Sequence, residues 1–81
     1  MTHTTDASVL KKIETLVHEE QHLYAKGSGL TDHDQVRLEG LRVELDQCWD
    51  LLRQRRAKRE FGEDPDQAQV RPKSIVEGYE Q

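Results

Sequence analysis

Residues 43–56 contain the second half of an apolar seam that ends in arginines, and they read Val43-Glu44-Leu45-Asp46-Gln47-Cys48-Trp49-Asp50-Leu51-Leu52-Arg53-Gln54-Arg55-Arg56. The seam starts upstream of this run, and its spacings alternate between three and four residues, which places it on one side of a helix. Its members are Leu38, Leu41, Leu45, Cys48 and Leu52. The same register continues at Arg55 and Arg59. The pattern predicts a helix that packs along its seam and then presents charge to an outside partner.

The composition suits a small helical module. The chain has 81 residues, of which 33% are hydrophobic and 35% are charged. These values allow one domain at most and are too polar for a large enclosed core. A lone helical pair of this size is marginally stable, because few buried side chains must offset the ordering of the whole backbone. Proteins of this kind are usually stabilised by self-association or by a constitutive binding partner.

Charge and cysteine content exclude several other classes of protein. The formal net charge of -4 argues against a general nucleic-acid coat. Cys48 is the one cysteine, so no intramolecular disulfide can form, and its seam position predicts a buried apolar role. Residues 1–12 lack the apolar core of a signal peptide, and no apolar run approaches the ~20 residues that cross a bilayer. The sequence therefore predicts a soluble, cytoplasmic protein.

The first helix is expected over residues 6–26, after a disordered start at 1–5. Asp6 is placed to cap it. Its apolar side chains form a stripe three positions wide in each heptad, as in the helices of bundles. The stripe consists of Val9, Leu10, Ile13, Leu16, Val17, Leu23 and Tyr24. Only Glu20 interrupts it.

A short glycine-containing tip, residues 27–31, predicts a hairpin. Gly27-Ser28-Gly29 stops the first helix, since glycine takes the left-handed conformation that closes a helix end. Thr31 or Asp32 caps a second helix over 32–61, which ends before Gly62. So short a connection makes the helices antiparallel neighbours. The predicted fold class is all-α, an antiparallel coiled-coil-like hairpin over residues 6–62, with the basic end of the second helix overhanging the first.

Residues 63–81 form an extended, polar tail with spaced apolar anchors, which are Val70, Ile75, Val76 and Tyr79. Residues 74–78 begin like a capping box and end in glycine, which predicts a single helical turn. Trp49 and Leu51 widen the apolar face of the second helix near this end. The pattern leaves two alternatives open, a tail partly docked on that face and a mobile tail.

One catalytic motif occurs in the first helix. His18-Glu19-Glu20-Gln21-His22 fits H-E-x-x-H, in which two histidines one turn apart bind zinc and the glutamate activates water. Both histidines fall on the solvent side of the helix, and no third ligand follows at a known spacing. His18 and His22 therefore remain candidate ligands of an adventitious metal site. A zinc-dependent hydrolase is the remote alternative, and no cofactor is predicted.

A basic run closes the second helix and consists of Arg53, Arg55, Arg56, Lys58 and Arg59. Such a run can bind phosphates, which leaves the alternative of a nucleic-acid or ribonucleoprotein accessory factor that uses residues 53–59. Its members spread around the helix, no aromatic residue interleaves, and acidic residues follow at once. A solvated helix end that pairs with the acidic tail is favoured. An arginine patch for an acidic protein surface is a third reading.

Residues 44–57 resemble the signature of a family of small bacterial proteins, the domain of unknown function 2630 family. The matching run is Glu44-Leu45-Asp46-Gln47-Cys48-Trp49-Asp50-Leu51-Leu52-Arg53-Gln54-Arg55-Arg56-Ala57. The tail is similar at Gly62-Glu63-Asp64-Pro65-Asp66, Val70-Arg71-Pro72 and Val76-Glu77-Gly78-Tyr79. The resemblance covers nearly the whole chain and is most specific in its second half. It implies a cytoplasmic helical protein with residues 70–79 docked, and it implies no activity.

These patterns predict a non-catalytic protein–protein interaction or adaptor module that self-associates. The hairpin should close by packing Val9, Leu10, Ile13, Leu16, Val17 and Leu23 on Leu38, Leu41, Leu45, Cys48 and Leu52. We expect a homodimer, a protein partner, or both, with an interface that includes Trp49, Leu51, Leu52, Arg55 and Arg59. No membrane and no small-molecule substrate are expected.

Overall fold

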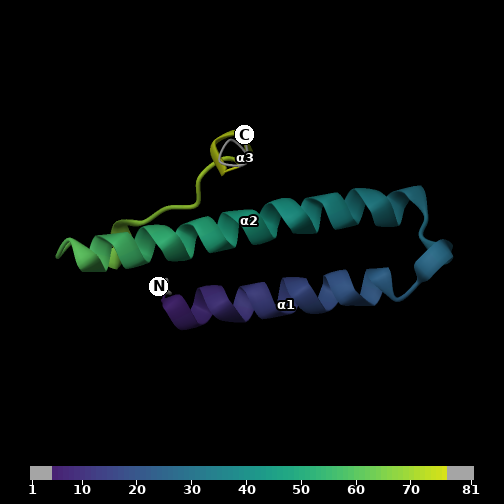
Figure 1. The fold of residues 1–81 in the computed structure, drawn as a ribbon, viewed down its shortest axis with the longest axis horizontal. Coiled ribbons are helices and arrows are strands. Elements are labelled where there is room, and N and C mark those ends of the chain that lie inside the picture. The colour runs from purple at the N-terminus through teal and green to yellow at the C-terminus, as the bar shows by residue number, and fades with distance from the viewer. Residues whose placement is uncertain (1–4, 77–81) are drawn as a thin grey trace.

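Two helices of unequal length lie antiparallel, and the segment after the second helix, up to Val76, folds back along the longer one (Figure 1). The computed structural model describes residues 5–76. In chain order its elements are α1 (Asp6–Tyr24), the 3-10 turn η1 (Gly27–Gly29), α2 (Asp32–Glu60), the 3-10 turn η2 (Pro65–Gln67) and α3 (Lys73–Val76). No strand occurs in this described part. The all-α hairpin with a partly docked tail that the sequence predicts is confirmed.

Both long helices begin with the same capping arrangement. Thr5 Oγ1 accepts a hydrogen bond from the Ser8 amide, and Ser8 Oγ accepts one from the Thr5 amide, each at 3.0 Å. Thr31 and Asp34 repeat this exchange at the start of α2. Each exchange satisfies amides that a helix start leaves unpaired. The prediction that Asp6 caps α1 is wrong, because Thr5 holds that position and leaves the Asp6 carboxylate free for another contact.

The tip and the chain ends differ slightly from the predicted boundaries. α1 ends two residues early, at Tyr24, and Gly27 takes the left-handed conformation, with φ of 58°, at the start of η1. α2 ends at Glu60, and Gly62 reverses the chain with φ of 72°. Of the start predicted to be disordered, Thr5 is the cap, and residues 1–4 lie outside the described residues.

The core lies between α1 and α2 and extends under the tail. Its buried apolar members are Val9, Ile13, Leu16, Leu23, Leu41, Cys48, Leu51 and Ala68. The prediction that Leu10 packs in this core is wrong, since 49% of it is exposed. Leu10 follows Val9, and one residue rotates a side chain by about 100° around the helix. The partly buried Val17, Leu38, Leu45 and Leu52 pack against the core from the same edge.

The tail is docked on α2 up to Val76 (Figure 1). The Gln54 amide nitrogen donates to the Gln69 carbonyl at 2.7 Å, and Gln47 donates to the Arg71 carbonyl at 3.2 Å. Ala68 and Val76 are its buried apolar contacts, whereas the predicted anchors Val70 and Ile75 are exposed. The helical turn starts at Lys73, and its predicted end at Gly78, like Tyr79, lies outside the described residues.

None of the helices within residues 5–76 is both long and apolar enough to cross a membrane.

Candidate protein-interaction surface

The basic end of α2 is bound by the start of α1. Arg55 Nε donates to Asp6 Oδ1 at 2.7 Å, and Arg59 Nη2 donates to Asp6 Oδ2 at 2.7 Å. Arg55 Nη1 also reaches Asp66 Oδ1 and the Pro65 carbonyl, at 3.0 and 3.2 Å. Only 5% of Arg55 is exposed. The end of α2 projects past the first turn of α1 (Figure 1), yet its arginines are paired, because Asp6 binds both of them and the tail binds Arg55.

The ion pairs around Arg55 shift the pKa values of Asp6 and of Arg55 itself. Hydrogen bonds from Arg59 and Arg55 hold the pKa of Asp6 below its usual value. Hydrogen bonds to Asp6 and Asp66 raise the pKa of Arg55, against the effect of its burial. A buried guanidinium needs such partners, since an unpaired buried charge is strongly destabilising. The cluster therefore ties α1, α2 and the tail together rather than offering free cations.

A second polar cluster, which the sequence did not reveal, holds the tail. Asp50 is 1% exposed and accepts from Arg71 Nε at 2.9 Å, from Arg71 Nη2, and from Gln54 Nε2 at 2.8 Å. The Arg71 contact lowers the pKa of Asp50 most strongly, against the effect of burial. The available signal was an acid placed between Trp49 and Leu51, a position where a lone charge needs a partner.

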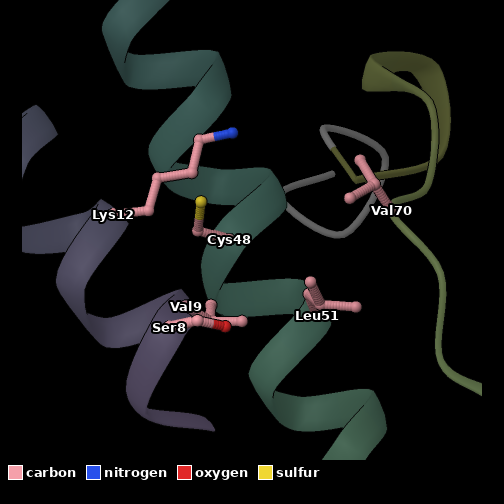
Figure 2. A pocket seen from close by; sticks show the side chains of 6 residues that line it. All are labelled: Ser8, Val9, Lys12, Cys48, Leu51 and Val70. Carbon is pink, nitrogen blue, oxygen red and sulfur yellow. The ribbon is translucent and has the colours of Figure 1, made fainter. Parts of the chain in front are cut away.

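A half-open cleft of about 240 Å³ separates α1 from the tail, and Figure 2 shows the side chains around it. Its lining consists of Ser8, Val9, Lys12, Cys48, Leu51 and Val70. Burial raises the pKa of the Cys48 thiol above its usual value. A protonated thiol is a poor nucleophile and a poor metal ligand. The predicted buried, apolar role of Cys48 matches this environment.

The two histidines of the H-E-x-x-H motif lie on the surface of the hairpin. His18 and His22 are both exposed on α1. The motif's Glu19 accepts from Arg37 Nε and Nη2 of α2, at 2.6 and 2.9 Å, and these hydrogen bonds lower the pKa of Glu19. Over residues 5–76, no group of three or more His, Cys, Asp or Glu side chains is arranged to hold a metal ion. Glu19 thus has a contact across the hairpin.

Two lines of apolar side chains remain beside the closed seam. On α1 the line is Leu10, Val17 and Tyr24, and on α2 it is Leu38, Leu45 and Leu52, flanked by Trp49. Residues seven apart share a face, because two helical turns take about seven residues. Leu10, Trp49 and Tyr24 are 49%, 46% and 61% exposed, and the other four are partly buried. We call these seven residues the apolar ridge.

Helical rotation puts both lines of the ridge on one side of the hairpin. Each α1 member follows a buried residue by one position, a rotation of about +100°. Leu45 follows the buried Leu41 by four positions, a net rotation of about +40°. Rotations of the same sense converge on one side when two helices are antiparallel. Gln47 and Leu51, which face the tail, are rotated from Cys48 in the opposite sense. Up to Val76, the last residue that the structure describes, the tail therefore leaves the ridge uncovered.

The residues that the sequence placed at an interface do not share one surface: some belong to the ridge, and the others contact the tail or Asp6. Trp49 and Leu52 belong to the ridge, and their interface role stays a prediction. Leu51 is buried toward the tail, and Arg55 is buried beneath Asp6 and Asp66, so neither offers a free surface in this structure. Arg59 is partly exposed and bound to Asp6. Sequence reasoning did not place Leu10 and Tyr24 at an interface; it predicted that Leu10 closes the hairpin and named Tyr24 only as part of the apolar stripe of the first helix.

Over residues 5–76, fold and surface together define a small helical hairpin with a docked tail and an exposed apolar ridge on one side. This chain belongs to the family described as protein of unknown function (DUF2630), whose model matches residues 5–81. It is similar to uncharacterized protein Rv0898c of Mycobacterium tuberculosis (strain ATCC 25618 / H37Rv) and to uncharacterized protein Mb0922c of Mycobacterium bovis. Each is 50% identical over 78 residues, which cover 93% of this chain and 90% of the relative. No solved structure matches the chain.

Proposed function

We propose that this protein is a non-catalytic protein–protein interaction module of the cytoplasm that self-associates through its helical hairpin. The observation that carries the proposal is the apolar ridge, in which Leu10, Trp49 and Tyr24 stay about half exposed after the hairpin has closed and the tail has docked up to Val76. A contiguous apolar patch on a small protein is typical of an interaction site. The ordered polar clusters, in contrast, have their partners within the chain.

Covering the exposed side chains of the ridge would yield a free energy that is large for so small a protein. An aromatic side chain buries up to about 250 Å² when fully enclosed. Covering the exposed half of Trp49 would thus contribute about 2–3 kcal/mol, at ~25 cal/mol per Å² of apolar surface. That is a substantial share of the ~5–15 kcal/mol by which domains are stable. Trp49, Leu10 and Tyr24 therefore supply a reason to associate.

The nucleic-acid alternative has less support from the arrangement of the basic run. Arg55 is buried, Arg59 is bound to Asp6, and Arg56 pairs with Glu60 at 3.1 Å. Phosphate binding by these cations would have to displace carboxylates that already hold them. The acidic net charge opposes it further.

Light scattering coupled to size-exclusion chromatography tests the proposal. The purified chain, run from 1 to about 200 μM after nuclease treatment, should shift from one copy toward a defined oligomer. Self-association should persist at 0.5 M salt, because apolar contacts resist screening. A constant monomer over this range would contradict self-association. A mass shift that nuclease abolishes would favour the nucleic-acid alternative.

A further inference from the structure

We propose that the apolar ridge binds the ridge of a second copy in a symmetric dimer, with α1 of each copy packed on α2 of the other. This inference rests on the self-association proposed above and adds the surface and the arrangement. Identical surfaces facing each other across a twofold axis form the commonest kind of closed oligomer. The result is a four-helix bundle with the two tails on its outer sides.

The spacing of the ridge matches what a helical bundle requires. Leu10, Val17 and Tyr24 repeat every seven residues along α1, and Leu38, Leu45 and Leu52 do so along α2. Heptad repeats keep an apolar line facing a partner helix over several turns. Seven such residues on two helices form a two-sided strip rather than a single isolated patch.

The two lines of the ridge are also level with each other. Asp6 lies beside Arg55, and Glu19 lies beside Arg37, so the hairpin places Leu10 level with residues near 50. By the same alignment, Val17 is level with residues near 40, and Leu38 is the ridge member of α2 nearest to that level. A twofold axis parallel to the helices keeps every residue at its level. It therefore brings Leu10 of one copy onto Trp49 of the other, twice.

Charge favours this arrangement over one that stacks α1 on α1. α1 carries four carboxylates and two lysines, so two α1 helices in contact would place like net charges together. α2 carries seven acidic and seven basic side chains and is neutral overall. Like charges brought together at an interface are costly, which selects against the α1-on-α1 packing.

The available area is sufficient. The molecule measures 49 × 29 × 20 Å, and the ridge lies on a face that runs along both helices. A stable interface takes about 800 Å² from each partner. A face spanned by two helices of 19 and 29 residues supplies that, with charged residues such as Glu14 and Arg53 at its outer edges.

Matched substitutions test the surface. Trp49→Glu and Leu10→Glu place a charge at the proposed central contact, and each should raise the dimer dissociation constant at least about 30-fold. Val36→Glu is the control, because Val36 is an α2 residue that is 72% exposed and outside the ridge. It should change the constant less than about 2-fold. Circular dichroism checks that all three variants retain their helices.

The wild-type chain provides a second readout that no failed variant can obscure. Trp49 is the only tryptophan. Its emission should shift to shorter wavelength as the concentration passes through the dissociation constant found by light scattering, because the dimer covers its exposed half. An oligomer that forms with no change in Trp49 emission would overturn the proposed surface.

Cysteine pairs test the arrangement. In a Cys48→Ser background, Val17→Cys is mixed with Leu38→Cys and oxidised. The mixture should form a cross-linked heterodimer, and Val17→Cys alone should not, since a disulfide needs Cα atoms within about 7 Å. Efficient cross-linking of Val17→Cys to itself would overturn the α1-on-α2 packing. A wild-type monomer contradicts the proposed function itself, whereas a dimer unaffected by Trp49→Glu and Leu10→Glu contradicts only this surface.

Discussion

Asp6, the first residue of α1, and Arg55, 49 residues later in α2, form an ion pair with 2.7 Å between Oδ1 and Nε. The pair connects the open end of the hairpin, where no covalent turn holds the helices. Asp66 reaches the same guanidinium from the tail. One buried arginine thus links three segments that are far apart in the sequence.

Asp6→Ala should lower the free energy of unfolding by about 1–2 kcal/mol, because it removes one carboxylate from a buried guanidinium that keeps Asp66. The expected loss of stability is modest because 39% of the Asp6 side chain is exposed to solvent. Urea unfolding followed by circular dichroism measures it. Asp32→Ala is the matched control, because Asp32 is the first residue of α2 and has the same relation to its helix dipole. Equal losses for both variants would show that the Arg55 contact adds nothing.

Arg71→Ala should loosen the tail. The substitution leaves the Asp50 carboxylate buried with Gln54 as its remaining partner, at a cost of about 2 kcal/mol. Hydrogen exchange should accelerate at the Ala68 and Gln69 amides, which bond to Pro65 and Gln54, before it does so in the centre of α2. Lys73→Ala, an exposed cation of the same tail, is the control. Unchanged exchange in Arg71→Ala would contradict the clamp.

Stability should fall in acid. The pKa of Asp50 is lowered by Arg71, and that of Asp6 by Arg59 and Arg55, relative to the ordinary value of 3.8. The unfolded chain therefore binds protons at higher pH than the folded chain. Stability from both pairs is present above pH 3.8 and is lost as the pH falls through the lowered values. Urea midpoints at pH 7, 5, 4 and 3 should stay level to about 5 and then decrease. The decrease should be shallower in Asp50→Asn.

Two glycine substitutions should have opposite effects. Gly27 has φ of 58°, which an L side chain adopts with strain, so Gly27→Ala should destabilise the fold by about 1 kcal/mol. Gly40 lies inside α2, and a Cβ there would meet nothing within 4 Å, so Gly40→Ala should stabilise it by about 0.5–1 kcal/mol. Thermal unfolding of both variants measures whether each substitution raises or lowers the stability. A shift of the same sign in both would contradict the backbone assignment at one of them.

Local patterns anticipated much of the secondary structure. Alternating spacings of three and four define α2, and Gly27 and Gly62 close the two helices with positive φ. These features depend on residues within one or two turns of each other. The stripe of α1 was assigned too broadly, because its width does not say which edge meets a single neighbouring helix and which edge stays exposed. Leu10 and Tyr24 are the residues for which that distinction matters.

The sequence by itself determined two amphipathic helices, the tight tip between them and hence their antiparallel packing, because periodicity and glycine act through short-range geometry. Only the tertiary structure decided which residues pair with the arginines at the end of the seam and which apolar side chains stay exposed. Pairing of the basic end with the acidic tail was predicted, but Asp6 is 49 residues from Arg55 in the chain, and no local rule pairs these two. Burial of a charge depends on partners that the whole fold brings together, and the same fold leaves the apolar ridge without cover.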